Sequence, residues 1–171
     1  KTERKFNVGR ILFIVIPVLV VFVFLSCVRI VPTGHTGIVT TFGKVEEASL
    51  ESGPNFVLPW QKVVNLDNRV QKVNILTDAF SSDIQQVDIT GSINYAINKS
   101  TAMTLFKEVG TNYYDKLINP RMMENTKAVF SKYTAENLVS ARETLSKQIR
   151  DDLSKEMDRY GITVISVSIE N

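Results

Sequence analysis

The spacing of hydrophobic positions changes along the chain. Residues 11–28 form an apolar run of 18 residues without a charge. Between residues 36 and 97, short stretches rich in Val, Ile and Phe are separated by Gly, Pro and Asn, which is typical of β-strands joined by turns. After residue 98 the apolar positions recur at helical spacing, and they alternate again over residues 162–169.

The clearest strand lies at residues 87–97, where apolar and polar side chains alternate. One face holds Val87, Ile89, Gly91, Ile93, Tyr95 and Ile97. This period predicts an antiparallel strand with one buried face. Helices are predicted over residues 101–109, 119–132 and 141–160, and Gly110 and Gly161 end the first and the third. Strands, then helices, then one returning strand predict an α+β domain with a single core.

The helix at residues 141–160 carries a narrow apolar stripe with a period of four, and the Ser140–Glu143 stretch reads as its capping box. The stripe fits a helix laid on a sheet or packed beside a neighbouring subunit. Charges on the same helix could pair around a ring of copies, although a solvated face is the alternative. The candidate oligomer interface is Leu145, Ile149, Arg150, Asp151, Leu153 and Met157.

The apolar run at residues 11–28 has three interpretations. A helix of this length reaches about 27 Å, close to the hydrocarbon thickness of a bilayer, and favours a permanent span. A cleaved signal would end in an A-x-A-like site, which the exit "SCVRIVP" does not offer. Cys27 could instead carry a lipid, as in a lipoprotein. Pro17 would kink a spanning helix or mark the tip of a shallow re-entrant hairpin.

Charge is concentrated at the start of the chain. The first ten residues have a net charge of +3 and the remainder has −1. Basic residues before the run place the N-terminus in the cytoplasm and export the domain behind it. A nearly neutral domain argues against nucleic-acid binding. One Cys and one His supply neither a disulfide framework nor a structural zinc site, so no cofactor or metal is expected.

The chain's single tryptophan lies in a short apolar stretch, Phe56, Val57, Leu58, Pro59 and Trp60. This stretch either dips into the membrane, with Trp60 at headgroup level, or is a turn packed on the sheet.

Carboxylate pairs raise the alternative of a hydrolase. The pair Asp151–Asp152 lies on a predicted helix, with its two side chains pointing apart, and Glu46–Glu47 is expected in an exposed loop. General acid–base catalysis needs convergent groups in a pocket, so no catalytic residue is predicted.

Six pieces of sequence in order carry a family resemblance. They are "VPTGHTGIVTTFGKV", "SGPNFVLPW", "NLDNRVQ", "DIQQVDITGSINYAI", "YTAENLVSARETLSKQI" and "YGITVISVSIEN", and they cover residues 30–171. Each piece is mostly turn glycines and apolar alternation, but the order behind an N-terminal apolar run is specific. The chain resembles the SPFH superfamily, also called band 7, and is more similar to prohibitins and their bacterial protease-modulating relatives than to flotillins.

The resemblance implies a membrane-tethered scaffold without catalytic chemistry. Such proteins assemble into rings or cages, organise membrane microdomains and modulate membrane AAA+ proteases. Its implied partners are membrane lipids, further copies or a related SPFH chain, and such a protease. The resemblance also implies a coiled coil beyond Asn171. The rival from another class is an extracytoplasmic binding module anchored through Cys27.

The sequence therefore predicts three segments. Residues 1–10 form a basic cytoplasmic N-terminus, residues 11–28 a transmembrane helix, and residues 30–171 an SPFH domain with an antiparallel sheet and helices. This domain is expected in the periplasm beside a bacterial inner membrane, or in the intermembrane space beside a mitochondrial inner membrane.

Overall fold

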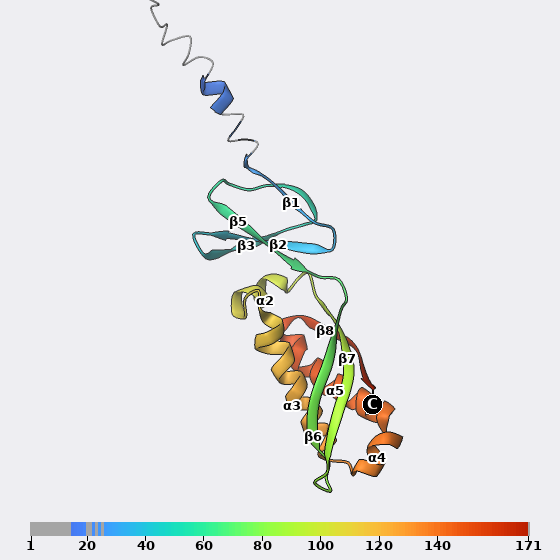
Figure 1. Cartoon of the computed structure of the whole chain (residues 1–171). Coiled ribbons are helices and arrows are strands. Elements are labelled where there is room, and N and C mark those ends of the chain that lie inside the picture. The colour runs from blue at the N-terminus through green and yellow to red at the C-terminus, as the bar shows by residue number, and fades with distance from the viewer. Residues whose placement is uncertain (1–14, 20–21, 23, 25, 171) are drawn as a thin grey trace, which may run out of the picture. The chain divides into compact units, whose positions relative to one another are not determined.

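The computed structural model describes residues 15–19, 22, 24 and 26–170. The chain divides into two compact units, an N-terminal unit, Lys1–Asn65, and a C-terminal unit, Leu66–Asn171 (Figure 1). The prediction of a single core is therefore wrong. Strands β1 to β5, within residues 28–67, pair only with one another, and strands β6 to β8, within residues 71–170, form a separate sheet. Each unit therefore has its own sheets.

The N-terminal unit is built from short strands. They form a two-stranded sheet of order β1-β4 and a three-stranded sheet of order β3-β2-β5. Their bounds are β1 Val28–Val31, β2 His35–Thr41, β3 Lys44–Leu50, β4 Gly53–Phe56 and β5 Gln61–Asp67.

A two-residue turn joins β2 to β3. Phe42 and Gly43 both have positive φ, 49° and 87°, as in the hairpin turns whose twist matches that of the flanking strands. Glu46 and Glu47 lie within strand β3, so the prediction that they lie in a loop is wrong. Residues 44–50 have no apolar alternation that would indicate a strand.

The C-terminal unit has an antiparallel sheet of order β6-β7-β8. These strands are β6 Gln71–Phe80, β7 Gln86–Ile97 and β8 Ile162–Glu170. The helices between β7 and β8 are α2 Ala102–Glu108, a π-helical turn Tyr114–Ile118, α3 Asn119–Phe130, α4 Ala135–Ser140, α5 Arg142–Met157 and a 3₁₀ turn Asp158–Tyr160. The predicted α+β class is confirmed (Figure 1).

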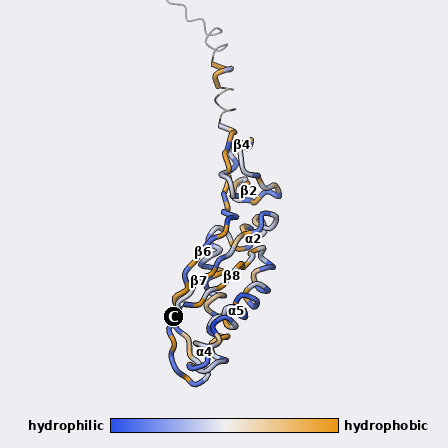
Figure 2. The backbone as a smooth tube through the Cα atoms, turned by 90° about the vertical axis from the view of Figure 1, so that its right-hand side faces the viewer, coloured by the Kyte–Doolittle hydropathy of each residue, from blue (hydrophilic) through white to orange (hydrophobic). Residues whose placement is uncertain are grey.

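The core of this unit lies between the sheet and helices α3 and α5. Residues of β7 alternate as predicted, and Ile89, Ile93, Tyr95 and Ile97 are buried. The α5 stripe is buried too, while most of α5 is hydrophilic in Figure 2. Of the two arrangements that the stripe allowed, the structure has the helix laid on the sheet, in contact with β8.

Helix ends explain where the capping prediction failed. Ser140 is the last residue of α4, and its hydroxyl donates a hydrogen bond to the Asn137 carbonyl oxygen, 3.0 Å away. The N-cap of α5 is Ala141, which makes no side-chain capping bond. The prediction of a capping box at Ser140 is therefore wrong. The predicted stop at Gly161 is confirmed, with a φ of 71°.

The apolar run lies partly outside the described residues, namely 11–14, 20–21, 23 and 25. Val15 to Leu19 are helical, as are Phe22, Phe24 and Ser26. Within the described part of the chain, no helix has the length and apolar character needed to cross a membrane.

Candidate functional site

Large apolar side chains of the N-terminal unit are turned to solvent. Every described Phe or Trp of this unit is exposed: Phe22 71%, Phe24 60%, Phe42 88%, Phe56 68% and Trp60 52%. Aromatic rings usually provide much of a domain's core, and a contiguous exposed apolar surface commonly marks an interaction site. This unit therefore exposes aromatic side chains from β4, from the β2–β3 turn, from the loop before β5 and from the apolar run.

The predicted membrane-contacting stretch is split by the structure. Val57 is 5% exposed, and its N–H donates to the Cys27 carbonyl oxygen, 2.7 Å away. Its side chain is part of the core, so membrane contact by Val57 is wrong. Phe56, Leu58, Pro59 and Trp60 are exposed and remain a prediction.

The Phe56 ring lies beside a residue of the apolar run. Its centroid is 5.4 Å from that of Phe24, and the two ring planes are tilted by 50°. Such tilted ring pairs are favourable contacts between aromatic side chains. Cys27, between the run and β1, is a half-buried free cysteine, and its lipidation remains a prediction.

A hydrogen-bonded glutamine joins two apolar loops of the N-terminal unit. The Leu58 N–H donates to Gln61 Oε1 at 3.0 Å, and Gln61 Nε2 donates to Thr41 Oγ1 at 3.1 Å. These bonds hold the loop before β5 against the β2–β3 turn. A groove of about 590 Å³ lies there, lined by Arg29, Thr40, Phe42, Gly43, Pro59, Trp60, Gln61 and Lys62.

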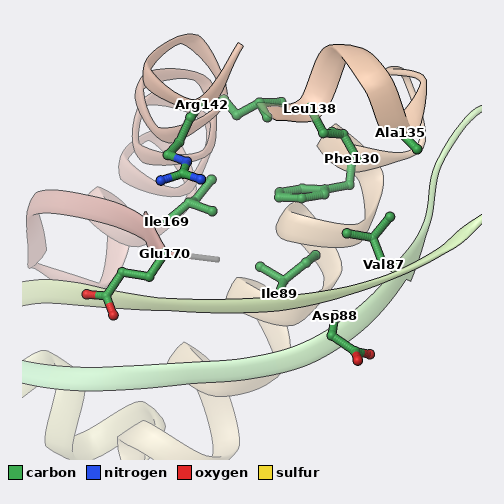
Figure 3. A pocket seen from close by; sticks show the side chains of 10 residues that line it. Val87, Asp88, Ile89, Phe130, Ala135, Leu138, Arg142, Ile169 and Glu170 are labelled. Carbon is green, nitrogen blue, oxygen red and sulfur yellow. The ribbon is translucent and has the colours of Figure 1, made fainter. Parts of the chain in front are cut away.

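The C-terminal unit has a smaller cavity of about 90 Å³ between its sheet and helices. Figure 3 shows its mostly apolar lining, with Arg142 and Glu170 at the edge and the Asp88 carboxylate turned away. Pockets for small ligands usually enclose about 300–1,000 Å³. This cavity is a packing gap rather than a site for a substrate.

The carboxylates of the hydrolase alternative do not converge. Asp151 accepts hydrogen bonds from the Arg150 guanidinium, the shorter at 2.7 Å, whereas Asp152 lies 4.0 Å from Lys155 Nζ. The bond from Arg150 lowers the pKa of Asp151. Within the described residues, no group of three or more His, Cys, Asp or Glu side chains could hold a metal ion.

The predicted oligomer interface is largely inside the domain. Leu145, Ile149, Leu153 and Met157 are at most 1% exposed because they pack within their own unit. Buried side chains cannot contact a neighbouring subunit, so this part of the prediction is wrong. Arg150 and Asp151 have side chains that are 40% and 46% exposed, and a role for them in assembly remains a prediction.

A half-buried polar cluster around the Tyr95 hydroxyl was not predicted from the sequence. The Tyr95 hydroxyl donates to Gln71 Oε1 at 3.1 Å, and Gln71 Nε2 lies 3.4 Å from the Tyr113 hydroxyl. Burial raises the pKa of Tyr95. The alternation over residues 87–97 places Tyr95 on the buried face of β7, and a buried phenol needs a polar partner. That requirement was the available signal, but it did not identify Gln71.

A second missed feature fixes the β6–β7 turn. Asp83 Oδ1 accepts a hydrogen bond from the Ala135 N–H at 3.1 Å and another from the Ser81 hydroxyl at 2.5 Å. These bonds lower the pKa of Asp83. The carboxylate thus accepts a hydrogen bond from a backbone N–H at the start of α4, although Asp83 is distant from this helix in sequence. Local sequence patterns do not indicate such a contact.

Comparison with known proteins identifies the architecture. The model of the SPFH domain / Band 7 family matches residues 29–171. The chain belongs to this family. Over 141 residues this band 7 chain is 28% identical to Prohibitin 1 of Bos taurus, covering 81% of this chain and 52% of that protein.

Fungal prohibitins show the same similarity. Prohibitin-1 of Saccharomyces cerevisiae is 26% identical over 126 residues, covering 73% of this chain and 44% of that protein. Prohibitin-2 of Colletotrichum higginsianum is 28% identical over 118 residues, covering 68% of this chain and 38% of that protein. The chain spans about half or less of the length of these relatives. The predicted SPFH and prohibitin-like resemblance is confirmed.

Proposed function

We propose that this band 7 chain is a membrane-anchored scaffold of the prohibitin type, with no catalytic chemistry and no cofactor. The observation that carries the proposal is the set of exposed aromatic side chains within and after the apolar run. Trp and other amphipathic or aromatic side chains are favoured where a membrane meets water. The N-terminal unit therefore lies against the lipid surface.

In this proposal, residues 11–28 cross the membrane once, with the basic N-terminus in the cytoplasm. The remaining residues lie in the periplasm or the mitochondrial intermembrane space. Phe56, Leu58, Pro59 and Trp60 contact lipid. The alternative anchor through Cys27 would give a mature protein that begins at that residue, with the mass of the added lipid.

The scaffold role requires many copies. Relatives of this chain include both a prohibitin-1 and a prohibitin-2, which supports assembly with itself or with a related SPFH chain. Arg150 and Asp151 are accessible on α5 and are the proposed lateral contacts. Rings or cages of this kind would organise a membrane microdomain and modulate a membrane AAA+ protease.

The test uses the single tryptophan of the chain. The full chain is reconstituted into phosphatidylcholine vesicles, and Trp60 fluorescence is recorded with brominated lipids whose bromine atoms sit at different depths. We expect the strongest quenching by bromine near the headgroups. Trp60 emission that no brominated lipid quenches would reject membrane contact by this stretch.

A further inference from the structure

The groove of the N-terminal unit combines basic and aromatic side chains. We propose that it binds the headgroup of an anionic phospholipid in the bilayer. Arg29 and Lys62 pair with the phosphate oxygens of the lipid, which has no choline cation to compete with them, and Phe42 and Trp60 contact the region where headgroup and acyl chains meet. This inference rests on the proposed membrane function and adds the class of lipid that the unit selects.

The groove is a built feature with fixed walls. The Thr40 hydroxyl donates to the Lys62 carbonyl oxygen at 3.3 Å, which supports the pairing of neighbouring strands β2 and β5. Gln61 bonds to both Leu58 and Thr41, at 3.0 and 3.1 Å. The loop that carries Trp60 and the turn that carries Phe42 are therefore held in place before any ligand arrives, which lowers the entropic cost of binding.

Charge is segregated toward this groove. The described N-terminal unit has three basic residues, Arg29, Lys44 and Lys62, and three acidic ones, Glu46, Glu47 and Glu51. Two of the basic residues line the groove and none of the acidic ones does. A concave surface with cations and no carboxylate complements an anionic headgroup, since phosphate oxygens form strong bonds with guanidinium and ammonium groups.

The aromatic wall has a conformation that favours exposure. Phe42 is 88% exposed and has a φ of 49°, a left-handed conformation that is uncommon for a bulky residue. A glycine or asparagine would occupy this turn position with less strain. A ring held outward there gains nothing in water but gains hydrophobic contact at a membrane interface.

The position of Arg29 indicates a lipid rather than a soluble anion. Arg29 follows the apolar run directly, in β1, and the neighbouring β4 ends at Phe56, whose ring contacts Phe24 of the run. If the run lies in the bilayer, a basic residue at its end lies at the level of the phosphates. The groove volume of about 590 Å³ falls within the range of small-ligand sites.

The experiment compares two brominated lipids around Trp60. The full chain is reconstituted into vesicles that mix phosphatidylglycerol and phosphatidylcholine, with bromine on one lipid or the other at equal mole fraction. The two quenching curves give the relative affinity of the Trp60 surroundings for the two headgroups. Each cation near an anionic surface contributes about fivefold, so we expect a preference of about 30-fold for phosphatidylglycerol.

A double variant, Arg29→Gln with Lys62→Gln, should reduce this preference to about onefold. Both side chains are exposed, so their replacement leaves the fold intact. The matched control is the double variant Lys99→Gln with Lys132→Gln, which changes two exposed residues of the C-terminal unit. It removes the same net charge and should retain the preference.

The outcomes separate this inference from the proposed function. Equal quenching of Trp60 by both lipids in the unaltered chain would overturn the headgroup site and leave membrane contact intact. Trp60 emission that neither lipid quenches would overturn both. An equal loss of preference in the groove variant and the control would also overturn the site, because it would assign the effect to net charge alone.

Discussion

The two units differ in the share of their large apolar side chains that they bury. In the C-terminal unit, the stripe of α5, which contacts β8, and the inner face of β7 are both buried. In the N-terminal unit, all described Phe and Trp side chains are exposed, although Val31, Ile38 and Val39 form a small core. The C-terminal unit thus gains its stability from its own packing.

This contrast locates the proposed contacts. The C-terminal unit buries the apolar stripe of α5 but leaves Leu76, Phe80 and Ile84 exposed. On α5, the accessible side chains of Arg150 and Asp151 are available to a protein partner. A domain that leaves aromatic rings outside needs another apolar surface to cover them. We propose the lipid bilayer as the cover for the unit that contains residues 11–28.

Matched leucine truncations provide the strongest test of this contrast. Leu153→Ala removes a side chain that is 0% exposed, and we expect a loss of about 2–5 kcal/mol in the free energy of unfolding. Leu58→Ala removes a side chain that is 48% exposed, and the loss should be about 0.5 kcal/mol. Urea unfolding in mild detergent, followed by circular dichroism, measures both. Similar losses would remove the contrast.

A pair of glycine replacements compares the packing of the two units at their turns. Gly43 and Gly161 both have positive φ, 87° and 71°. An added Cβ at Gly43 meets nothing within 4 Å, whereas one at Gly161 overlaps Thr101. Gly43→Ala should cost about 1–2 kcal/mol from backbone strain alone. Gly161→Ala should cost about 1–3 kcal/mol more because Thr101 must move. Thermal unfolding that ranks the two variants equally would contradict this packing.

Asp83 gives a pH-dependent prediction within the C-terminal unit. Hydrogen bonds from Ser81 and from the Ala135 N–H lower its pKa below the usual 3.8. A lowered pKa in the folded state stabilises the protein above the unfolded-state pKa, and this stabilisation is lost as pH falls through the folded-state pKa.

Asp83→Asn should therefore be less stable than the unaltered chain at neutral pH, with the difference shrinking as the pH falls below 3.8 and through the lowered pKa of Asp83. Urea midpoints measured across this range test the prediction. Asp78→Asn is a control, since Asp78 is an exposed residue of the same hairpin. A difference that does not vary with pH would show that the Asp83 carboxylate charge is not responsible.

The smallest effect on stability is expected at Arg150 and Asp151, whose ion pair is half exposed. Arg150→Asp alone should reduce the size of detergent-extracted particles if this pair forms a lateral contact. The exchange of both residues, Arg150→Asp with Asp151→Arg, retains the net charge and the intrachain pair. Particles of unchanged size in both variants, measured by electron microscopy, would reject a role for this face.

The long periodic elements were predictable from the sequence. The alternation over residues 87–97 and the period of four in α5 arise because one face of each element is buried in the core of the C-terminal unit. Helix α4 was missed because six residues are too few to show a helical period. The split into two units was missed as well, because strand pairing partners are distant in sequence and turn signals do not identify them.

The candidate sites were less predictable. The stretch around Trp60 was recognised from its composition, but the inward direction of Val57 depends on a backbone bond to Cys27. The α5 stripe was assigned to two possible partners, and only the structure shows that β8 covers it. Arg29 and Lys62 are far apart in sequence, and the pairing of β1 with β4 and of β2 with β5 places both in one groove.

A comparison of Phe42 with Ile84 tests the central claim most directly. Both lie in hairpin turns with positive φ, 49° and 60°, and they are 88% and 84% exposed in the two different units. Phe42→Cys and Ile84→Cys, each in a Cys27→Ser background, provide one site for a spin label. Accessibility to oxygen and to a water-soluble nickel complex is then measured in vesicles. We predict lipid exposure at position 42 and water exposure at position 84. Water exposure at position 42, or the same environment at both positions, would contradict a membrane-facing N-terminal unit.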